Sequence, residues 1–153
     1  AEPDIFHPGD LDYIHSVERI SRLSNVISIN GGVQLDLMGQ ENAESTGTRQ
    51  LSGVGGQMDF LEGAYRSKGG KGFICINSSR VTKDGERKSN ILATIPGGST
   101  ISAPRTMIQY VATEYGIASL SGKTLRERAE AMASIAHPDF REELMKYAQE
   151  NFK

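Results

Sequence analysis

The chain has 153 residues, of which 37% are apolar and 24% charged, and this suits one globular domain with its own core. With 17 basic and 19 acidic residues the net charge is −2, so we expect no nucleic-acid partner. The apolar runs are too short for a membrane span and we expect no secretory signal; the single cysteine, Cys75, fits a reducing compartment because it cannot form an internal disulfide.

The first 39 residues predict an irregular start, a short helix and strand-like segments. Residues 1–10 contain two prolines and a glycine, as linkers do. Apolar side chains within residues 13–20 fall on one face of a short helix. Residues 33–37 alternate apolar and polar side chains, which predicts a half-buried strand. The glycines of residues 30–32 are compatible with a tight turn or with a bulge inside one long strand.

The middle of the chain predicts a loop, a helix and several strands. Residues 40–50 are polar and are interpreted as a loop. Residues 57–67 carry apolar side chains at helical spacing, and the glycines that follow end this helix. Cys75 is expected to be a small buried residue of the first strand after the helix. The strands expected here are 72–79, 89–96, 99–104 and 107–115, with a turn at Asp84-Gly85 after the first.

The C-terminal third predicts two consecutive helices. Thr124 and Glu127 form a capping-box pattern at the start of the first helix. His137-Pro138 then interrupts the chain, and Asp139 begins a second helix. Strands mixed with helices, and helices gathered at the end, indicate α/β or α+β layers. The residues expected to be buried are Leu125, Ala129, Met132 and Ala136 in the first helix, and Phe140, Leu144 and Tyr147 in the second.

The stretch SGVGGQMDF, residues 52–60, places three glycines in four positions directly before the helix predicted at 57–67. Glycine tolerates positive φ and allows another molecule to approach the backbone closely. The N–H groups of such a loop and of the following helix start can converge on a phosphate, a carboxylate or a developing oxyanion. A tight connection that binds no ligand is the alternative that composition leaves open.

Two nucleotide-binding sites fit this glycine-rich stretch poorly. A dinucleotide-binding turn requires a small residue where the chain has Met58, and the next strand ends near Asn77 instead of the acidic residue that would bind a ribose. A P-loop is excluded because no Gly-Lys-Ser/Thr follows at the required spacing. The interpretation that remains is an oxyanion site for an acyl group or a carboxylate.

Several stretches, in a fixed order, resemble the C-terminal domain of the acetyl-CoA hydrolase/transferase family, which includes transferases of the 4-hydroxybutyrate type. They are ISIN, VQLDLMGQENAES, RQLSGVGGQMDF, GAYRSKGGK, APRT and YVATEYGIASLSGKTLRERAEAMASIAHPDFREEL, and they cover nearly everything after about residue 26. The resemblance implies an α/β fold, with an open mixed sheet flanked by helices, as in the second domain of CoA-transferases. It divides the chain into an inter-domain segment, 1–25, and a C-terminal domain, 26–153.

The resemblance also implies covalent CoA transfer. In this family a glutamate attacks an acyl-CoA, a glutamyl-CoA thioester forms, and a second carboxylate takes the CoA. The glycine loop would bind the oxyanion through its backbone, with Gly55 as the main residue and Gly53, Val54 and Gly56 beside it. The family's nucleophile motif lies upstream and is not found here, since Glu18 in YIHSVERI departs from it. The isolated chain is therefore expected to lack turnover.

Further side chains are candidates for the same site. Glu114 matches a family glutamate, and it would position the nucleophile, hold the glycine loop, or form a structural ion pair with an arginine. Glu44 and Gln57 would line the cleft or be solvated loop side chains. Arg105 would bind a carboxylate or pair structurally, and His137 is expected to pack or cap a helix. Basic residues that could attract CoA phosphates are Arg66, Lys68 and Lys71.

Two alternatives to CoA transfer stay open. Water in place of the acceptor carboxylate would make the protein an acyl-CoA hydrolase. The chain could also be a non-catalytic CoA-binding module or a fragment of a larger enzyme. The expected partners are an acyl-CoA, a small carboxylate and an N-terminal CoA-transferase domain, with a homo-oligomer left open. CoA is expected as a substrate, with no metal or other cofactor, and the expected location is the cytoplasm.

Overall fold

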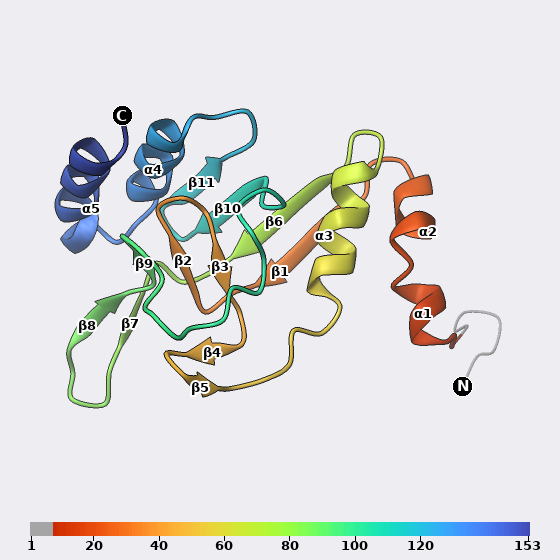
Figure 1. Cartoon of the computed structure of the whole chain (residues 1–153), viewed down its shortest axis with the longest axis horizontal. Coiled ribbons are helices and arrows are strands. Elements are labelled where there is room, and N and C mark those ends of the chain that lie inside the picture. Colours follow the sequence, from red (N-terminus) through yellow and green to blue (C-terminus); the bar gives the residue numbers. More distant parts are fainter. Residues whose placement is uncertain (1–7) are drawn as a thin grey trace.

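The computed structural model describes residues 8–153, and a four-stranded sheet with the order β1-β6-β10-β11 forms its centre (Figure 1). β1, β6 and β10 run parallel, and β11 is antiparallel to β10. The expected open mixed sheet flanked by helices is therefore confirmed. The strands are β1 (Ile27–Gly31), β6 (Lys71–Cys75), β10 (Tyr110–Thr113) and β11 (Gly116–Ser119).

The helices α3 and α4 cover one face of this sheet. α3 packs on β1 and β6, α4 packs on β11, and α5 packs on α4. The side chains that the sheet turns toward these helices, including Ile74, Val111 and Ala118, are buried. α2 packs on α3, where Ile20 lies against Gly63. The helices are α1 (Leu11–Ile14), α2 (Val17–Arg22), α3 (Gln57–Arg66), α4 (Leu125–Ser134) and α5 (Pro138–Asn151).

A smaller three-stranded sheet, β3-β2-β9, and two hairpins complete the described part. The Asp84-Gly85 turn predicted from the sequence joins the strands of the β7–β8 hairpin, and Gly85 has φ 80°. The loop expected at 40–50 instead contains three two-residue strands, and these depend on pairing with other short segments. The bounds are β2 (Gln34–Asp36), β3 (Glu41–Asn42), β4 (Ser45–Thr46), β5 (Arg49–Gln50), β7 (Ser79–Val81), β8 (Arg87–Ser89) and β9 (Ile91–Leu92).

Three strand predictions were wrong in informative ways. Residues 30–32 form neither a hairpin turn nor a bulge, because the chain leaves the four-stranded sheet at β1 and enters the smaller sheet at β2. The alternation in 33–37 does not make a half-buried strand, since Gln34, Leu35 and Asp36 are all buried. Residues 99–104 contain no strand, and only Ala103 makes an isolated bridge, to Glu41.

The C-terminal helices begin as the sequence predicts. Thr124 accepts a hydrogen bond from the Glu127 N–H while the Glu127 carboxylate accepts one from the Thr124 N–H, so the capping box is confirmed. His137 caps α5 through its imidazole, which accepts from the Asp139 N–H. Leu125 was expected in the buried stripe but is 39% exposed, because it lies in the first turn of α4 at the surface.

Cys75 is exposed, and its predicted burial is wrong. It is the last residue of β6, and its side chain points away from the face that α3 covers, where Ile74 is buried. Of the irregular segment predicted at the start of the chain, residues 1–7 lie outside the described residues. Within residues 8–153, no helix combines the length and the apolar character that crossing a membrane requires.

Candidate active site

The carboxyl ends of the three parallel strands form one edge of the sheet with an open pocket. β1, β6 and β10 end at this edge because parallel strands share one direction. Ligands of open α/β sheets bind beyond the carboxyl ends of the strands, where the loops leave room. The pocket has a volume of about 430 Å³ and is lined by Gly32, Cys75, Ile76, Asn77, Ala112 and Thr113.

The glycine loop reaches the same edge because α3 is the crossover between β1 and β6. The end of α3 lies near the start of β1, where Ser67 donates a hydrogen bond to the Leu23 carbonyl, so its start lies toward the carboxyl edge. Gly55 has φ 61°, a left-handed conformation that favours glycine. Gly56 is the N-cap and offers no side-chain acceptor to the first turn. The first N–H groups of α3 are therefore not capped by a side chain at position 56.

A second pocket, of about 400 Å³, lies between the glycine loop and α1. Gly55 and Gly56 line it together with Leu11, Asp12, His15 and Asp59. The His15 imidazole presses on the loop so closely that a Cβ on Gly56 would overlap the ring. His15 Nδ1 is 3.3 Å from the Asp59 carboxylate. Gly53 and Val54 are exposed beside this pocket.

Gln57, the first residue of α3, is buried and bonded to a buried carboxyl group. Its side-chain amide donates a hydrogen bond to Glu41 Oε2 in β3. Glu41 is 0% exposed, and its Oε1 has no hydrogen-bond partner among the described residues. Desolvation raises the pKa of Glu41 from 4.5 to about 8, against the lowering effect of the Gln57 hydrogen bond. Glu41 is therefore neutral at pH 7 and fixes the start of α3 through Gln57.

The glycine at position 32 connects this buried carboxyl group to the pocket at the strand ends. A Cβ on Gly32 would lie 2.6 Å from Glu41 Oε1 and 3.1 Å from Ile76, so only glycine fits there without a shift of its neighbours. Gly32 also lines the pocket at the strand ends. Glu41 thus lies directly behind one wall of that pocket, while Gln57 links it to the glycine loop.

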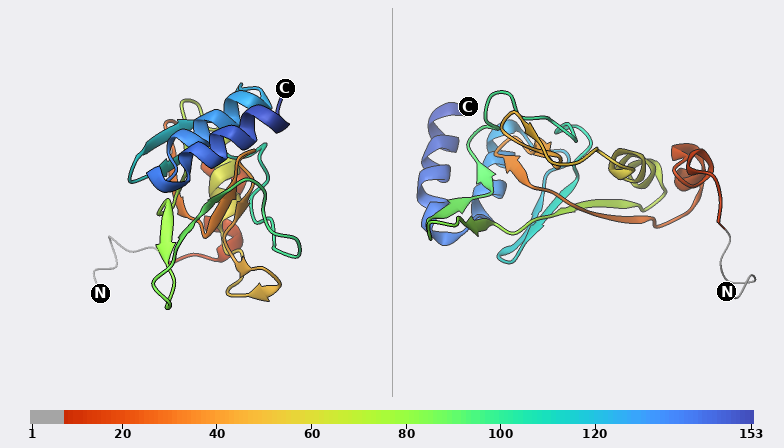
Figure 2. Two further views of the ribbon diagram at one scale, coloured as in Figure 1. Left: turned by 90° about the vertical axis from the view of Figure 1, so that its left-hand side faces the viewer. Right: turned by 90° about the horizontal axis from the view of Figure 1, so that it is seen from below.

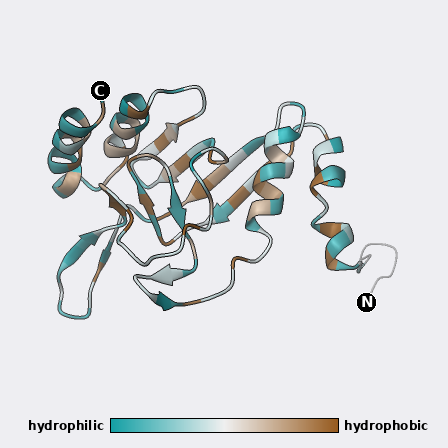
Figure 3. Ribbon diagram, viewed as in Figure 1, coloured by the Kyte–Doolittle hydropathy of each residue, from teal (hydrophilic) through white to brown (hydrophobic). Residues whose placement is uncertain are grey.

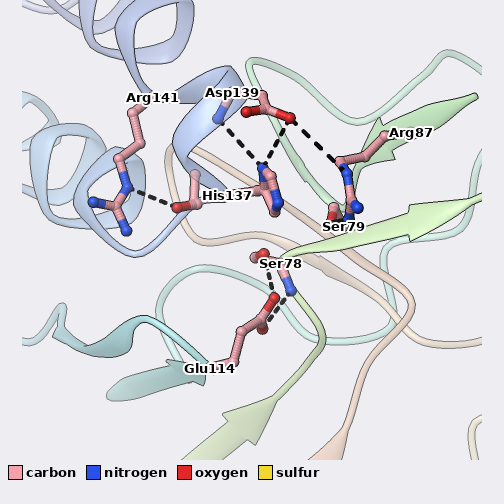
Figure 4. A network of polar contacts seen from close by, with 8 residues as sticks. Ser78, Ser79, Arg87, Glu114, His137, Asp139 and Arg141 are labelled. Atoms are coloured by element: carbon pink, nitrogen blue, oxygen red, sulfur yellow. Dashed lines mark hydrogen bonds and ion pairs between the residues drawn. The ribbon is translucent and has the colours of Figure 1, made fainter.

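Glu114 follows β10 at the carboxyl edge, and Figure 4 shows its contacts. Its carboxylate accepts hydrogen bonds from the Ser78 N–H at 2.9 Å and the Ser78 hydroxyl at 2.6 Å. Desolvation pushes the pKa of Glu114 upward, but the bonds from Ser78, together with nearby His137, outweigh this and hold the pKa below its usual value. No arginine pairs with Glu114 among the described residues, and no hydrogen bond joins it to the glycine loop.

The remaining candidates have structural partners. The Glu44 carboxylate accepts hydrogen bonds from Gln50 at 3.0 Å and from Ser102 at 2.9 Å, which anchors the β4–β5 hairpin. Arg105 is exposed and contacts the Met38 sulfur at 3.4 Å. Across residues 8–153, no cluster of three or more His, Cys, Asp or Glu side chains has the arrangement of a metal site.

Sequence reasoning missed Glu41 and His15 as neighbours of the glycine loop. Glu41 belongs to a polar stretch interpreted as a loop, and its burial depends on the bridge to Ala103, far away along the chain. Nothing in the local sequence places His15 on Gly56. The pairing of the lead-in segment with the loop is a tertiary contact that periodicity does not reveal.

Comparisons with known proteins agree on one kind of protein. A family model described as "Acetyl-CoA hydrolase/transferase C-terminal domain" matches residues 3–148. A butyryl-CoA:acetate CoA-transferase of Anaerostipes caccae is 47% identical over 139 residues, which are 91% of this chain and 31% of that protein. A 4-hydroxybutyrate coenzyme A transferase of Clostridium kluyveri is 47% identical over 142 residues, which are 93% of this chain and 32% of that protein.

A solved structure gives the same result for the fold. The crystal structure of RipA from Yersinia pestis superposes with a TM-score of 0.80 at 40% identity, covering 91% of this chain and 30% of that one. The chain spans about a third of the length of the curated relatives it matches.

Proposed function

The chain belongs to the acetyl-CoA hydrolase/transferase family, and we propose that it is the C-terminal domain of a CoA-transferase. The complete enzyme would move CoA between an acyl-CoA and a free carboxylate. The 47% identity to two CoA-transferases supports this choice over other reactions of the family. The nucleophilic glutamate would come from a part of the protein that the present chain does not contain, so the chain alone would lack turnover.

The proposed reaction proceeds through two covalent intermediates. A glutamate carboxylate attacks the acyl-CoA carbonyl, the thiolate of CoA leaves, and a mixed anhydride forms. The thiolate then attacks the glutamyl carbonyl, which releases the first acyl group as a carboxylate and leaves a glutamyl-CoA thioester. The acceptor carboxylate then attacks the glutamyl-CoA thioester, which releases the thiolate of CoA and forms a second mixed anhydride. The thiolate attacks the acceptor's carbonyl in this anhydride, which gives the new acyl-CoA and frees the glutamate. Each step passes through a tetrahedral intermediate whose oxygen carries negative charge, and this oxygen must be stabilised.

The backbone geometry at the start of α3 is the main support for this proposal. Gly55 is in the left-handed conformation, and Gly56, the N-cap of α3, has no side chain. The backbone N–H groups at the start of α3 therefore have no side-chain acceptor from position 56. Asp12 and Asp59 line the adjacent pocket, so a doubly charged phosphate would meet carboxylates there. A carbonyl oxygen that gains charge only during the reaction fits this mixed environment better. We therefore assign the loop amides of Gly53, Val54, Gly55 and Gly56 to the oxyanion.

Gln57 and Glu114 serve this site in different ways under the proposal. Gln57 holds the helix start through neutral Glu41, which keeps the loop amides in place. Glu114 is exposed and directly follows Thr113, which lines the pocket at the strand ends, and two hydrogen bonds from Ser78 fix its orientation. An ionised carboxylate in that place would position the incoming nucleophile of the missing part. Glu44 lies in the supporting hairpin, so we assign it no contact with substrate.

An activity assay tests the proposal. We expect transfer of CoA from acetyl-CoA to butyrate by the complete polypeptide, and none by residues 1–153 alone. Transfer by the isolated chain would contradict the assignment of the nucleophile to the missing part. Release of free CoA in the absence of any added carboxylate would instead identify an acyl-CoA hydrolase, the other activity in the family's description. CoA binding without either reaction would indicate a non-catalytic module. A cytoplasmic location remains a prediction from the single thiol and the family.

A further inference from the structure

One side chain of the lead-in segment, which precedes β1 and contains α1 and α2, lies on the glycine loop. This side chain is His15, which directly follows α1 and whose N–H donates to the Leu11 carbonyl at 2.8 Å. Ser16, the next residue, is the N-cap of α2 and accepts a hydrogen bond from the Arg19 N–H. The helix ends on both sides of His15 are therefore fixed, and its backbone occupies a defined bend.

The bend is attached to α3, the helix that begins at the glycine loop. α2 packs on α3, and Figure 2 (right) shows the lead-in helices, drawn in red, beside α3. Both lead-in helices carry hydrophobic and hydrophilic residues (Figure 3). The apolar Ile20 of α2 is buried and lies against Gly63 of α3. The packing of these helices therefore sets where His15 lies relative to the glycine loop.

The imidazole of His15 lies across one face of the first turn of α3. It contacts Gly56, Asp59 and Phe60, which share this face because they are spaced i, i+3 and i+4. Nδ1 is 3.3 Å from Asp59 Oδ2, and the ring is edge-on to Phe60 with centroids 5.1 Å apart. The His15 side chain is only 24% exposed, so these three contacts hold the ring in one place.

Gly55 and Gly56 lack side chains for different reasons. Gly55 has φ 61°, and a Cβ there would meet no atom within 4 Å, so its requirement for glycine is conformational. Gly56 has φ −90° and ψ 10°, which other residues also adopt in turns. A Cβ on Gly56 would, however, overlap the His15 ring. The ring therefore explains the glycine at position 56, and the two residues form a matched pair.

Asp59 gives His15 a second effect on the loop. With Gly56 as the N-cap, Asp59 is the third residue of α3, the position from which an acidic side chain reaches back to the N-cap N–H in a capping box. An acceptor there would occupy an amide of the glycine loop. The Asp59 carboxylate lies beside His15 Nδ1 instead, and no hydrogen bond joins it to the Gly56 N–H in the part of the chain that the structure describes.

We propose that His15 is a positioning residue for the oxyanion amides at the start of α3, a role that rests on the proposed function. The ring holds Gly56 from the side of α1, and neutral Glu41 holds Gln57 from the core. By engaging Asp59, His15 also keeps the Gly56 N–H available to the reacting carbonyl oxygen. Donors that are fixed before the reaction need no reorganisation when charge develops on that oxygen.

A double-variant cycle in the complete polypeptide tests this role. We expect His15→Ala to lower kcat about 10-fold with the KM for acetyl-CoA changed less than about twofold, because the amides act on the transition state. Gly56→Ala should lower kcat similarly when His15 is present, since its Cβ displaces the ring. In the His15→Ala background the ring's space is empty, so Gly56→Ala should cost little further activity.

The control is Tyr13→Ala, which removes a ring of α1 that lies against Arg19, with 3.4 Å from the guanidinium carbon to the ring centroid. We expect its kcat to equal that of wild type. Free imidazole should restore part of the kcat of His15→Ala and leave that of Tyr13→Ala unchanged, because it refills the space over Gly56. Circular dichroism shows whether each variant is folded.

The outcomes separate this role from the proposed function. An unchanged kcat for His15→Ala, or an equal cost of Gly56→Ala with and without His15, overturns the role while CoA transfer by wild type still stands. Wild type without CoA transfer overturns the proposed function and the role with it. If His15→Ala does not fold, Gly56→Ala alone decides, since it displaces the ring without truncating it, and an unchanged kcat overturns the role.

Discussion

Glu41 and Glu114 are both close to the carboxyl edge of the sheet, but their surroundings are opposite. Glu41 is 0% exposed and accepts one hydrogen bond, from Gln57, so desolvation dominates and its pKa is raised to about 8. Glu114 is exposed and accepts two hydrogen bonds from Ser78, so its pKa is lowered. One carboxyl group is neutral at pH 7 and the other is ionised.

The difference shows that the two carboxyl groups play different parts in the structure. Glu41 is buried behind the wall of the pocket at the strand ends and holds the first residue of α3 through its hydrogen bond from Gln57. On the Glu114 side, a charged side chain is itself presented at the surface. The same residue type therefore supports structure in one place and can meet a partner in the other, and burial decides which.

The largest expected effect is a pair of opposite pH dependences of stability. The pKa of Glu41 is raised on folding, so the folded protein binds the Glu41 proton more tightly than the unfolded chain does. The resulting contribution to the free energy of unfolding is fully present below about pH 4.5 and is lost as the pH rises toward 8. A tenfold change in an acid dissociation constant corresponds to about 1.4 kcal/mol, so wild type should be less stable than Glu41→Gln by about 5 kcal/mol above pH 8, and by little near pH 4.

The matching change at Glu114 should show the reverse trend. Because the pKa of Glu114 is lower in the folded protein than in the unfolded chain, Glu114 stabilises the fold at pH values above its unfolded pKa. This stabilisation is lost as the pH falls through the folded pKa. Glu114→Gln should therefore be less stable than wild type at pH 7 and equal to it at low pH. Urea unfolding of the three proteins between pH 3 and 9 measures both trends. Parallel curves for wild type and Glu41→Gln would show that Glu41 is not a buried neutral acid.

The next effect concerns the backbone of the glycine loop. In the complete enzyme, Gly55→Val should lower kcat roughly 10²–10³-fold, because a β-branched residue does not adopt φ 61° and the loop amides would lose their alignment. Gly97→Val is the control, since a Cβ there meets no atom within 4 Å and its φ is not positive. Steady-state kinetics with acetyl-CoA and butyrate compare them. An unchanged kcat for Gly55→Val would remove the loop from the reaction.

The negative charge of Glu114 should have a smaller effect on kcat than the glycine loop. Glu114→Gln keeps the shape and an acceptor for Ser78 but removes the negative charge, and we expect kcat of the complete enzyme to fall about 10-fold. The KM for acetyl-CoA should change little, since the proposed role is to orient the nucleophile. A variant that loses affinity for CoA instead, with kcat intact, would place Glu114 in substrate binding.

Local signals in the sequence located the helices but not the two carboxyl environments. The spacing of Met58 and Leu61, and the capping box of Thr124 and Glu127, depend on neighbours within a few residues, and the helices at these positions were predicted correctly. The short strands of the smaller sheet are fixed largely by partners elsewhere along the chain, so they had no local pattern. Glu41 was unrecognised for the same reason, because Ala103 and Gln57 create its burial.

The smallest expected effect tests the hydrogen bond that separates Glu114 from an ordinary surface carboxylate. Ser78→Ala removes the hydroxyl donor and leaves the backbone N–H, so the unfolding free energy at pH 7 should fall by about 0.5–1 kcal/mol, a modest figure because Glu114 is exposed. The deficit should shrink as pH falls and Glu114 is protonated. Ser134→Ala is the control, because Ser134 donates to the Ala131 carbonyl and its loss has no titrating partner. A deficit that is equal at pH 7 and pH 3 would mean that Ser78 stabilises the strand end by packing, and that the bond contributes nothing to the ionised state of Glu114.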